Sequence, residues 1–242
     1  MLQLRAAADA GADRGTRHRL LQALPEVRRY ALLSGLLAAL YVAFSVAVAA
    51  GLPHSYDLAV SKALASIYVP PLLPLFRALA LLGGLELTLL LAVGLFLYLW
   101  RQGYRLAAFG TAALPLATLV ETAYKHTINH PEPPHGHPDG PSLSMLFEGP
   151  PSTAWSYPSG HMTRSVVVYG LLAFVIQRLA GPGSLRRWAV PLAIAVIITE
   201  AFDRLYLEVH WESDVLGGIL LGATFLAASI AWLEWSEARV ER

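Results

Sequence analysis

The feature that most constrains this chain is a series of long apolar runs. The first, Tyr30–Leu52, contains no charged residue and is long enough to cross a hydrocarbon core about 30 Å thick. Five more runs follow, at Leu79–Trp100, Leu106–Tyr124, Met162–Leu179, Trp188–Phe202 and Val215–Trp235. Because backbone groups in lipid must form their hydrogen bonds internally, such runs fold as helices. The sequence therefore predicts an all-α, polytopic membrane protein with six transmembrane helices in a bundle.

The composition of the 242-residue chain excludes several classes of protein. Hydrophobic residues make up 55% and charged residues 14%, with a mean hydropathy of +0.50, whereas soluble domains carry roughly 25% charged residues. The composition therefore argues against a soluble chain and against a disordered one. The net charge of +1 supplies no basic field for nucleic acid. The absence of cysteine excludes a disulfide scaffold, a thiolate zinc site and a cysteine nucleophile.

The distribution of Lys and Arg predicts the orientation in the cell membrane. With six spans, both termini and two of the connecting loops lie on one side, which receives 13 of the 18 basic residues. By the positive-inside rule this side is cytoplasmic. We therefore expect a cytoplasmic N-terminal segment at 1–28, a six-helix membrane domain at 29–236 and a cytoplasmic tail at 237–242. The loop at 131–158 holds 8 of the 16 prolines, so it is expected to be irregular and extracytoplasmic.

A small-residue pattern lies in the last apolar run. Gly218 and Gly222 form a GxxxG sequence, which lets helices approach closely. We interpret it as a packing surface inside the bundle rather than as a dimer contact, and the sequence assigns no oligomeric state.

Candidate chemistry gathers on the predicted outer side, where seven of the eight histidines lie. Three short stretches stand out there: Lys125–Pro133, Tyr157–His161 and Arg204–Asp214. In the second stretch, Ser159 and Gly160 are expected to begin a helix and to present free backbone N–H groups. Such a helix end favours an anion. The active site is therefore expected to be extracytoplasmic and to bind a negatively charged group.

The spacing of His210 and Asp214 indicates an oriented imidazole. If the last helix begins near His210, Asp214 lies one turn further on the same face. A carboxylate there can hold one ring nitrogen and leave the other free as a nucleophile or base. With the nearby cations Lys125 and Arg204, the stretches contain what phosphoryl transfer needs: cations and N–H groups hold the oxygens, one histidine attacks and another protonates the leaving oxygen.

A zinc site is the competing use of so many histidines. His126 and His130 have an i, i+4 spacing that binds metal only within a helix, and Pro131 ends such a helix. The stretches contain no HExxH-like arrangement, and the nearby Lys and Arg side chains would repel a cation. We therefore expect no metal and no cofactor.

The three stretches together resemble the type 2 phosphatidic acid phosphatase superfamily. The family pattern is K-x6-R-P, then P-S-G-H, then S-R-x5-H-x3-D. The second motif matches in full at 158–161, the third matches at its Arg, His and Asp, and the first matches at its Lys and its Pro. The motifs span 125–214, and the six-helix layout extends the resemblance over nearly the whole chain.

The resemblance implies a role for each matching residue. His210 is the expected nucleophile that forms a phosphohistidine, Asp214 its orienting carboxylate, and His161 the general acid for the departing group. The expected phosphate cradle consists of Lys125, Arg204, Ser159 and Gly160. Membrane members of the family hydrolyse phosphomonoester or diphosphate groups on lipids without a metal. The expected partner is therefore a lipid phosphate in the bilayer, such as an isoprenoid diphosphate or a phosphatidate-type lipid.

Two residues depart from the family pattern. Glu132 stands where the pattern has Arg, and Asp203 where it has Ser; a carboxylate facing the phosphate would repel it by roughly 1–4 kcal/mol. Arg164, one turn past His161, is a candidate phosphate ligand that restores a positive charge. The alternative is that Arg164 pairs with Asp203 or Glu132 and never meets substrate. Two further functions stay open: a lipid phosphotransferase that uses the same intermediate, and a catalytically silent lipid-phosphate binder.

Overall fold

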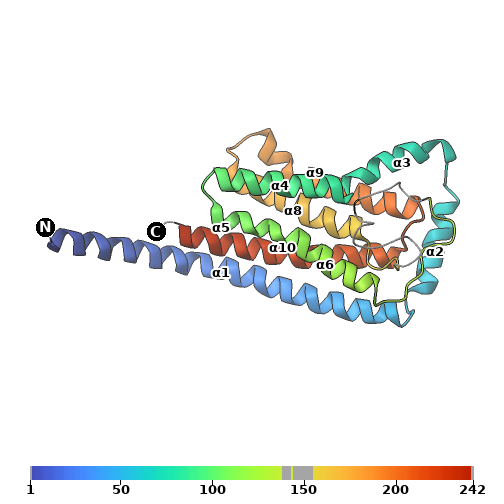
Figure 1. Cartoon of the computed structure of the whole chain (residues 1–242), viewed down its shortest axis with the longest axis horizontal. Coiled ribbons are helices and arrows are strands. Elements are labelled where there is room, and N and C mark those ends of the chain that lie inside the picture. The colour runs from blue at the N-terminus through green and yellow to red at the C-terminus, as the bar shows by residue number, and fades with distance from the viewer. Residues whose placement is uncertain (1, 138–142, 144–154, 241–242) are drawn as a thin grey trace.

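The protein is helical throughout the part of the chain that its computed structural model describes, which is residues 2–137, 143 and 155–240 (Figure 1). In chain order the α-helices and the short 3₁₀ turns (η) are α1 (Leu2–Ala49), α2 (His54–Ala65), η1 (Pro70–Leu72), α3 (Leu73–Leu79), η2 (Ala80–Leu82), α4 (Leu85–Arg101), α5 (Arg105–Ala108), η3 (Phe109–Ala112), α6 (Ala113–Lys125), α8 (Gly160–Leu179), α9 (Ser184–Tyr206) and α10 (Glu212–Val240). This confirms the predicted all-α class. Residues 138–142 and 144–154 of the predicted proline-rich loop lie outside the described ranges.

Five helical segments in the described ranges are long and apolar enough to cross a membrane. They are Pro25–Ala49, Pro70–Arg101, Arg105–Lys125, Gly160–Leu179 and Glu212–Glu237. The remaining predicted run, Trp188–Phe202, forms the middle of α9. Every 18-residue stretch of α9 has at least three charged residues. By composition alone, this helix is therefore not a candidate span like the other five. The structure therefore gives five candidate spans where the sequence predicts six.

The second predicted run, Leu79–Trp100, is not one continuous helix. Three prolines open the short η1 and α3 elements, η2 follows, and α4 begins only after the Gly83–Gly84 pair. A Cβ atom on Gly83 would lie 3.0 Å from the Cβ of His161 and closer still to the carboxylate of Glu200. The break therefore lets the backbone approach these two side chains, which a continuous helix with a larger residue at this position would prevent.

The last helix, α10, is the centre of the packing. It contacts α1 along much of its length, and it also contacts α8, α6 and α9. Its small residues face α8, since a Cβ on Gly218 would lie 2.8 Å from the Cβ of Met162, and one on Gly222 would lie 2.8 Å from the carbonyl oxygen of Thr163. The interpretation of the GxxxG pattern as a packing surface inside the bundle is confirmed.

The two ends of the bundle differ in character (Figure 1). The N-terminal end of α1 and the C-terminal end of α10 lie at the same end, and α1 extends well beyond the other helices there. At the opposite end, α2 lies across the bundle and α3 leans outward. The C-terminal ends of α6 and α9 and the N-terminal ends of α8 and α10 meet beside α2. This second end therefore collects all three stretches that carry the candidate chemistry.

Candidate active site

Backbone hydrogen bonds join the three stretches at the α2 end of the bundle. The N–H of Ser159 donates to the carbonyl oxygen of Asp214 at 3.0 Å, which ties the start of α8 to the start of α10. The N–H of Trp155 donates to the carbonyl oxygen of Lys125 at 3.0 Å, which ties the end of α6 to the segment before α8. Residues far apart in the sequence therefore form one compact site.

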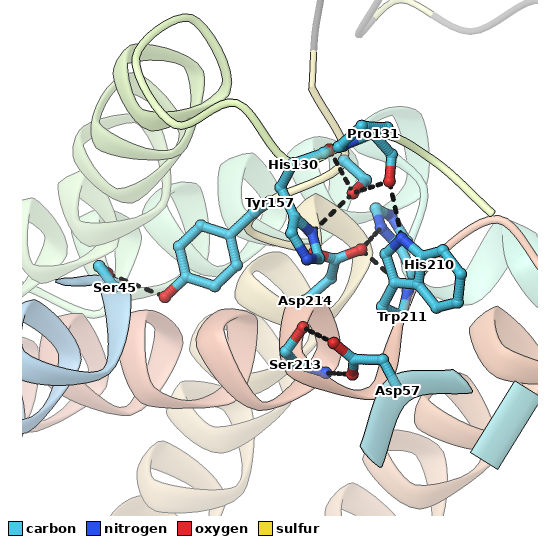
Figure 2. Close-up of polar contacts among 10 residues, drawn as sticks. Ser45, Asp57, His130, Pro131, Tyr157, His210, Trp211, Ser213 and Asp214 are labelled. Carbon is cyan, nitrogen blue, oxygen red and sulfur yellow. Dashed lines mark hydrogen bonds and ion pairs between the residues drawn. The ribbon is translucent and has the colours of Figure 1, made fainter. Parts of the chain in front are cut away.

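His210 and Asp214 are in contact, as their spacing predicts. Nδ1 of His210 lies 3.3 Å from Oδ2 of Asp214, and the N–H of Trp211 donates to the same oxygen at 2.9 Å (Figure 2). Burial lowers the pKa of His210, and the charges of Lys125 and Arg204 lower it further, which outweighs the opposing effect of Asp214. The imidazole is therefore neutral at pH 7, with Nδ1 engaged and Nε2 left for chemistry.

A second histidine contacts the same carboxylate. Nδ1 of His130 lies 2.9 Å from Oδ1 of Asp214 and 3.2 Å from Oγ of Ser156 (Figure 2). Burial lowers the pKa of His130, but the hydrogen bond to Asp214 and the charges of Asp214 and Asp57 outweigh burial, so the pKa is raised overall. The sequence suggested His130 as a metal ligand or as an additional donor, and the structure places it in contact with the carboxylate of Asp214.

The residues predicted to bind an anion lie at the N-terminus of α8. Ser159 precedes the helix, and its buried Oγ has no hydrogen-bond partner among the described residues. Gly160 must be glycine, because a Cβ there would clash with the carboxylate of Glu121 and would lie 2.7 Å from a guanidinium nitrogen of Arg164. His161 follows in the first turn and is partly buried. The positions predicted to hold an anion therefore do form a helix start.

Three cationic side chains are buried in the same region. Lys125, Arg164 and Arg204 expose 7%, 1% and 1% of their surface, and all three lie within electrostatic reach of His161. Arg164 donates from Nε to the carbonyl oxygen of Gly83 at 3.2 Å and pairs with the carboxylate of Glu121 at 3.3 Å. Arg164 is thus paired with an acid, as the alternative interpretation had it, but the acid is Glu121 rather than Asp203 or Glu132.

The two residues that depart from the family pattern lie in different environments. Asp203 is fully buried and accepts hydrogen bonds from the guanidinium of Arg204, its neighbour in the chain. Glu132 is exposed. The exposed position of Glu132 therefore does not support the predicted repulsion between its carboxylate and a bound phosphate.

A small hollow borders His210. It is lined by His210 and Trp211, by Asp57 of α2, by Pro133, and by Glu208 and Glu212. Within the described residues, no group of three His, Asp or Glu side chains is arranged to hold a metal ion. The chemistry that the site can support is attack by an imidazole on a group held by a helix N-terminus and by buried cations.

The fold and the site together define a helical membrane protein with a histidine–aspartate centre at one end of its bundle. The family model described as the PAP2 superfamily matches residues 104–238, which is more than half of the chain. The chain belongs to the PAP2 superfamily, and the resemblance drawn from its motifs is confirmed.

Named relatives and a solved structure extend this result. The chain is 26% identical over 189 residues to phosphatidylglycerophosphatase B of Bacillus subtilis, covering 75% of this chain and 85% of that protein. It is 35% identical over 83 residues to an undecaprenyl-diphosphatase of Sulfolobus acidocaldarius, covering 34% of this chain and 36% of that protein. The crystal structure of a transmembrane PAP2-type phosphatidylglycerolphosphate phosphatase from Bacillus subtilis superimposes with a TM-score of 0.64 at 23% identity, covering 80% of this chain and 92% of that chain. The chain therefore has the fold of a transmembrane PAP2 protein.

Two residues of the site, Ser156 and Asp57, were not identified from the sequence, and His130 was considered only as a metal ligand or an additional donor. Ser156 lies within the proline-rich loop, His130 directly precedes this loop, and Asp57 comes from α2. The cluster of outer-side histidines was the available signal for His130. No spacing rule connects Asp57 to a residue 156 positions later, so only the packing of α2 onto α10 reveals it.

Proposed function

We propose that this protein is an integral-membrane lipid phosphatase that removes a phosphomonoester or diphosphate group through a phosphohistidine at His210. The observation that carries the proposal is the hydrogen bond between His210 and Asp214 beside the N-terminus of α8. A protein that only binds phosphate needs cations and N–H groups, but it has no use for a nucleophile held in one orientation by a buried carboxylate. The geometry therefore supports catalysis over silent binding.

The first half-reaction transfers the phosphoryl group to the enzyme. The Nε2 lone pair of His210 attacks phosphorus, and the bond between phosphorus and the leaving oxygen breaks. Asp214 stabilises the positive charge that develops on the imidazole. His161 gives its proton to the leaving oxygen, so that a lipid alcohol or a lipid monophosphate departs. The products are the released lipid and phosphorylated His210.

The second half-reaction returns the enzyme to its starting state. A water molecule attacks the phosphohistidine, its proton passes to His161, and the P–N bond breaks to release inorganic phosphate. In both steps Lys125, Arg204, the Ser159 hydroxyl and the Gly160 N–H hold the non-bridging oxygens. Because these groups supply the positive charge that the transition state needs, we propose that the reaction is independent of metal.

Arg164 has a supporting role in this scheme. Its guanidinium is engaged by Glu121 of α6 and by the carbonyl oxygen of Gly83, before α4, so it ties α6 and the Gly83 turn to the start of α8. We propose that Arg164 does not contact the phosphate directly. Its positive charge, held behind the start of α8, instead contributes to the electrostatic attraction of the phosphate.

Two substrate classes are proposed from the relatives. The names of phosphatidylglycerophosphatase B and undecaprenyl-diphosphatase point to a glycerophospholipid phosphate and to an isoprenoid diphosphate. Both carry a terminal phosphate at the membrane surface, which fits a site at the end of a helical bundle. The silent-binder alternative depended on Glu132 and Asp203. Glu132 is exposed and Asp203 is paired with Arg204, so neither residue favours that alternative.

We also propose that α9 is the sixth span and that the site faces outward. The charged residues near its C-terminal end, Glu200, Asp203 and Arg204, are all buried in the protein. Large apolar side chains form its exposed surface, among them Leu192 and Ile198, which are 59% and 62% exposed. A helix of this kind places its charges in the protein interior and its apolar side chains against lipid. Six spans, combined with the excess of Lys and Arg at the other end of the bundle, would support an extracytoplasmic site.

The test is phosphate release by the detergent-purified protein. Phosphatidylglycerol phosphate, phosphatidate and undecaprenyl diphosphate are assayed with and without EDTA, beside His210→Ala and the matched control His135→Ala, an exposed histidine of the neighbouring loop. We expect release that survives EDTA, is unchanged in His135→Ala and falls by about 1,000-fold or more in His210→Ala. Release abolished by EDTA, or retained in His210→Ala, would overturn the mechanism.

A further inference from the structure

The Asp214 carboxylate contacts two imidazole rings, those of His130 and His210. Orienting a single histidine nucleophile requires only one of these contacts. His130 contacts Oδ1 at 2.9 Å, while His210 and the Trp211 N–H both contact Oδ2, at 3.3 and 2.9 Å. In Figure 2 the two rings approach the carboxylate from different sides. The shorter of the two histidine contacts belongs to His130, the histidine with no role in the proposed reaction.

His130 is held firmly in this position. The N–H of Ser156 donates to its carbonyl oxygen at 2.9 Å, and Oγ of Ser156 lies 3.2 Å from its Nδ1. The next carbonyl, of Pro131, accepts the indole N–H of Trp211 at 2.7 Å. The rings of Tyr157 and Trp211 lie edge-on to the imidazole, with centroids 6.3 and 6.5 Å away. The contact with Asp214 is therefore built into the site by several independent bonds.

We propose that His130 is a positioning residue that shares Asp214 with His210, so that a proton on His130 withdraws the carboxylate from the nucleophile and slows the reaction. This inference rests on the proposed function of His210. When His130 is neutral, it donates one hydrogen bond and leaves the negative charge of Asp214 to support His210. When His130 is protonated, it forms an ion pair with Asp214, and the charge that stabilises a phosphorylated imidazole is largely cancelled.

The charged groups around His130 favour its protonated form. Asp214 faces it from α10 and Asp57 contributes from α2, and both favour protonation. Tyr157, before α8, and His210, before α10, are the other titratable groups beside it. Burial opposes protonation but does not prevail, so the pKa is raised, whereas that of His210 is lowered. The two histidines therefore lose their protons as a coupled pair, His210 at lower pH and His130 at higher pH.

The order in which the two histidines are protonated determines the direction in which the pH–rate profile shifts when His130 is replaced. As the pH falls, His130 takes up a proton first, while His210 is still neutral. Protonation of His130 therefore sets the acid limb of the pH–rate profile, which is the fall in rate on its acidic side. Removing the titrating group at position 130 leaves only the protonation of His210 to limit the rate. The acid limb then moves to lower pH. A merely structural role for His130 would lower activity at every pH without moving the limb.

The test compares His130→Asn with His130→Ala, using His135→Ala as the control. The amide nitrogen of Asn stands about where Nδ1 of histidine does, so His130→Asn keeps a donor to Asp214 but cannot titrate. In both variants we expect the acid limb of kcat to move down by about one pH unit with KM unchanged. His130→Ala should also lose about tenfold in kcat, and His130→Asn should recover most of that loss. An unchanged limb in both variants would overturn the proposal.

A second measurement separates this inference from the proposed function. With ¹⁵N-histidine-labelled protein in detergent, we expect His210 to titrate in two steps in the wild type and in one step in His130→Asn. If the wild type releases no phosphate but this change is seen, the shared carboxylate stands and the phosphatase proposal falls. If phosphate is released while neither the titration nor the limb changes, the role of His130 is wrong and the phosphatase proposal stands.

Discussion

The Asp57 carboxylate of α2 accepts two hydrogen bonds from Ser213 in the first turn of α10, at 2.9 Å from the backbone N–H and 2.8 Å from the hydroxyl (Figure 2). Asp57 is 1% exposed. Free N–H groups at a helix start need acceptors, and here the acceptor comes from a separate helix. Because Asp214 is the next residue, α2 fixes the helix end that carries the Asp214 carboxylate.

Replacing Asp57 should therefore affect both stability and catalysis. In Asp57→Ala, the buried N–H and hydroxyl of Ser213 lose their partner, which costs about 1–3 kcal/mol in the free energy of unfolding. We expect kcat to fall about tenfold, because the start of α10 is loosened beside His210, the proposed nucleophile. Thermal unfolding in detergent and phosphate release measure the two effects. Lys62→Ala, an exposed change on the same helix, should alter neither, and an equal loss in that control would assign the effect to α2 as a whole.

The buried pair of Glu121 and Arg164 leads to a prediction about stability. The two residues expose 0% and 1% of their surface, so Glu121→Gln leaves a buried arginine without this counter-charge. Breaking such a pair costs about 3–5 kcal/mol, whereas replacing both partners by apolar residues is often neutral. We expect a large drop in the unfolding temperature of Glu121→Gln and a recovery in the double variant Glu121→Leu/Arg164→Met.

The matched control for this pair lies at the other end of the bundle. Arg178 pairs with Glu234 there, but Arg178 is 44% exposed, so Arg178→Met should cost less than about 1 kcal/mol. If Glu121→Gln is no more costly than Arg178→Met, the pair is not the structural link between α6 and α8 that we infer.

Gly83 and Gly94 provide a pair of substitutions with opposite outcomes. A Cβ on Gly83 would meet Glu200 and His161, whereas one on Gly94 would have nothing within 4 Å. In Gly83→Ala we expect overpacking to cost about 1–3 kcal/mol and, because His161 is displaced, kcat to fall more than KM rises. In Gly94→Ala, inside α4, we expect a gain of up to about 1 kcal/mol with unchanged kinetics. Wild-type kcat in Gly83→Ala would show that the approach to His161 has no catalytic importance.

The sequence was sufficient for the parts of this protein that depend on local pattern. Long apolar runs must be helical in lipid, and the pattern P-S-G-H predicts the start of α8. The four-residue spacing of His210 and Asp214 predicts their contact, although His210 lies two residues before α10 and not in its first turn. Each of these depends on residues close together in the chain, so no knowledge of packing was needed.

The parts that could not be predicted depend on which elements pack together. The partner of Arg164 is Glu121, on a helix that precedes it by 43 positions, and the second partner of Asp214 is His130, 84 positions away. The run at Leu79–Trp100 predicted one helix, because nothing in its hydropathy marks Gly83 as the point where the backbone meets His161. Charge pairing and close approach are tertiary properties, and one sequence does not specify them.

The buried hydroxyl of Ser159 leads to the sharpest test of the phosphate cradle. Its Oγ has no hydrogen-bond partner among the described residues, and the same is true of Ser165, further along α8. Removing an unsatisfied buried hydroxyl does not destabilise a protein, so Ser159→Ala and Ser165→Ala should both unfold at or above the wild-type temperature. Their kinetics should differ, because a hydrogen bond from Ser159 to a charged phosphate oxygen contributes about 1.5–3 kcal/mol. We expect kcat/KM for phosphate release to fall about 10- to 100-fold in Ser159→Ala and to stay at the wild-type value in Ser165→Ala. Equal kinetics in the two variants would remove Ser159 from the cradle.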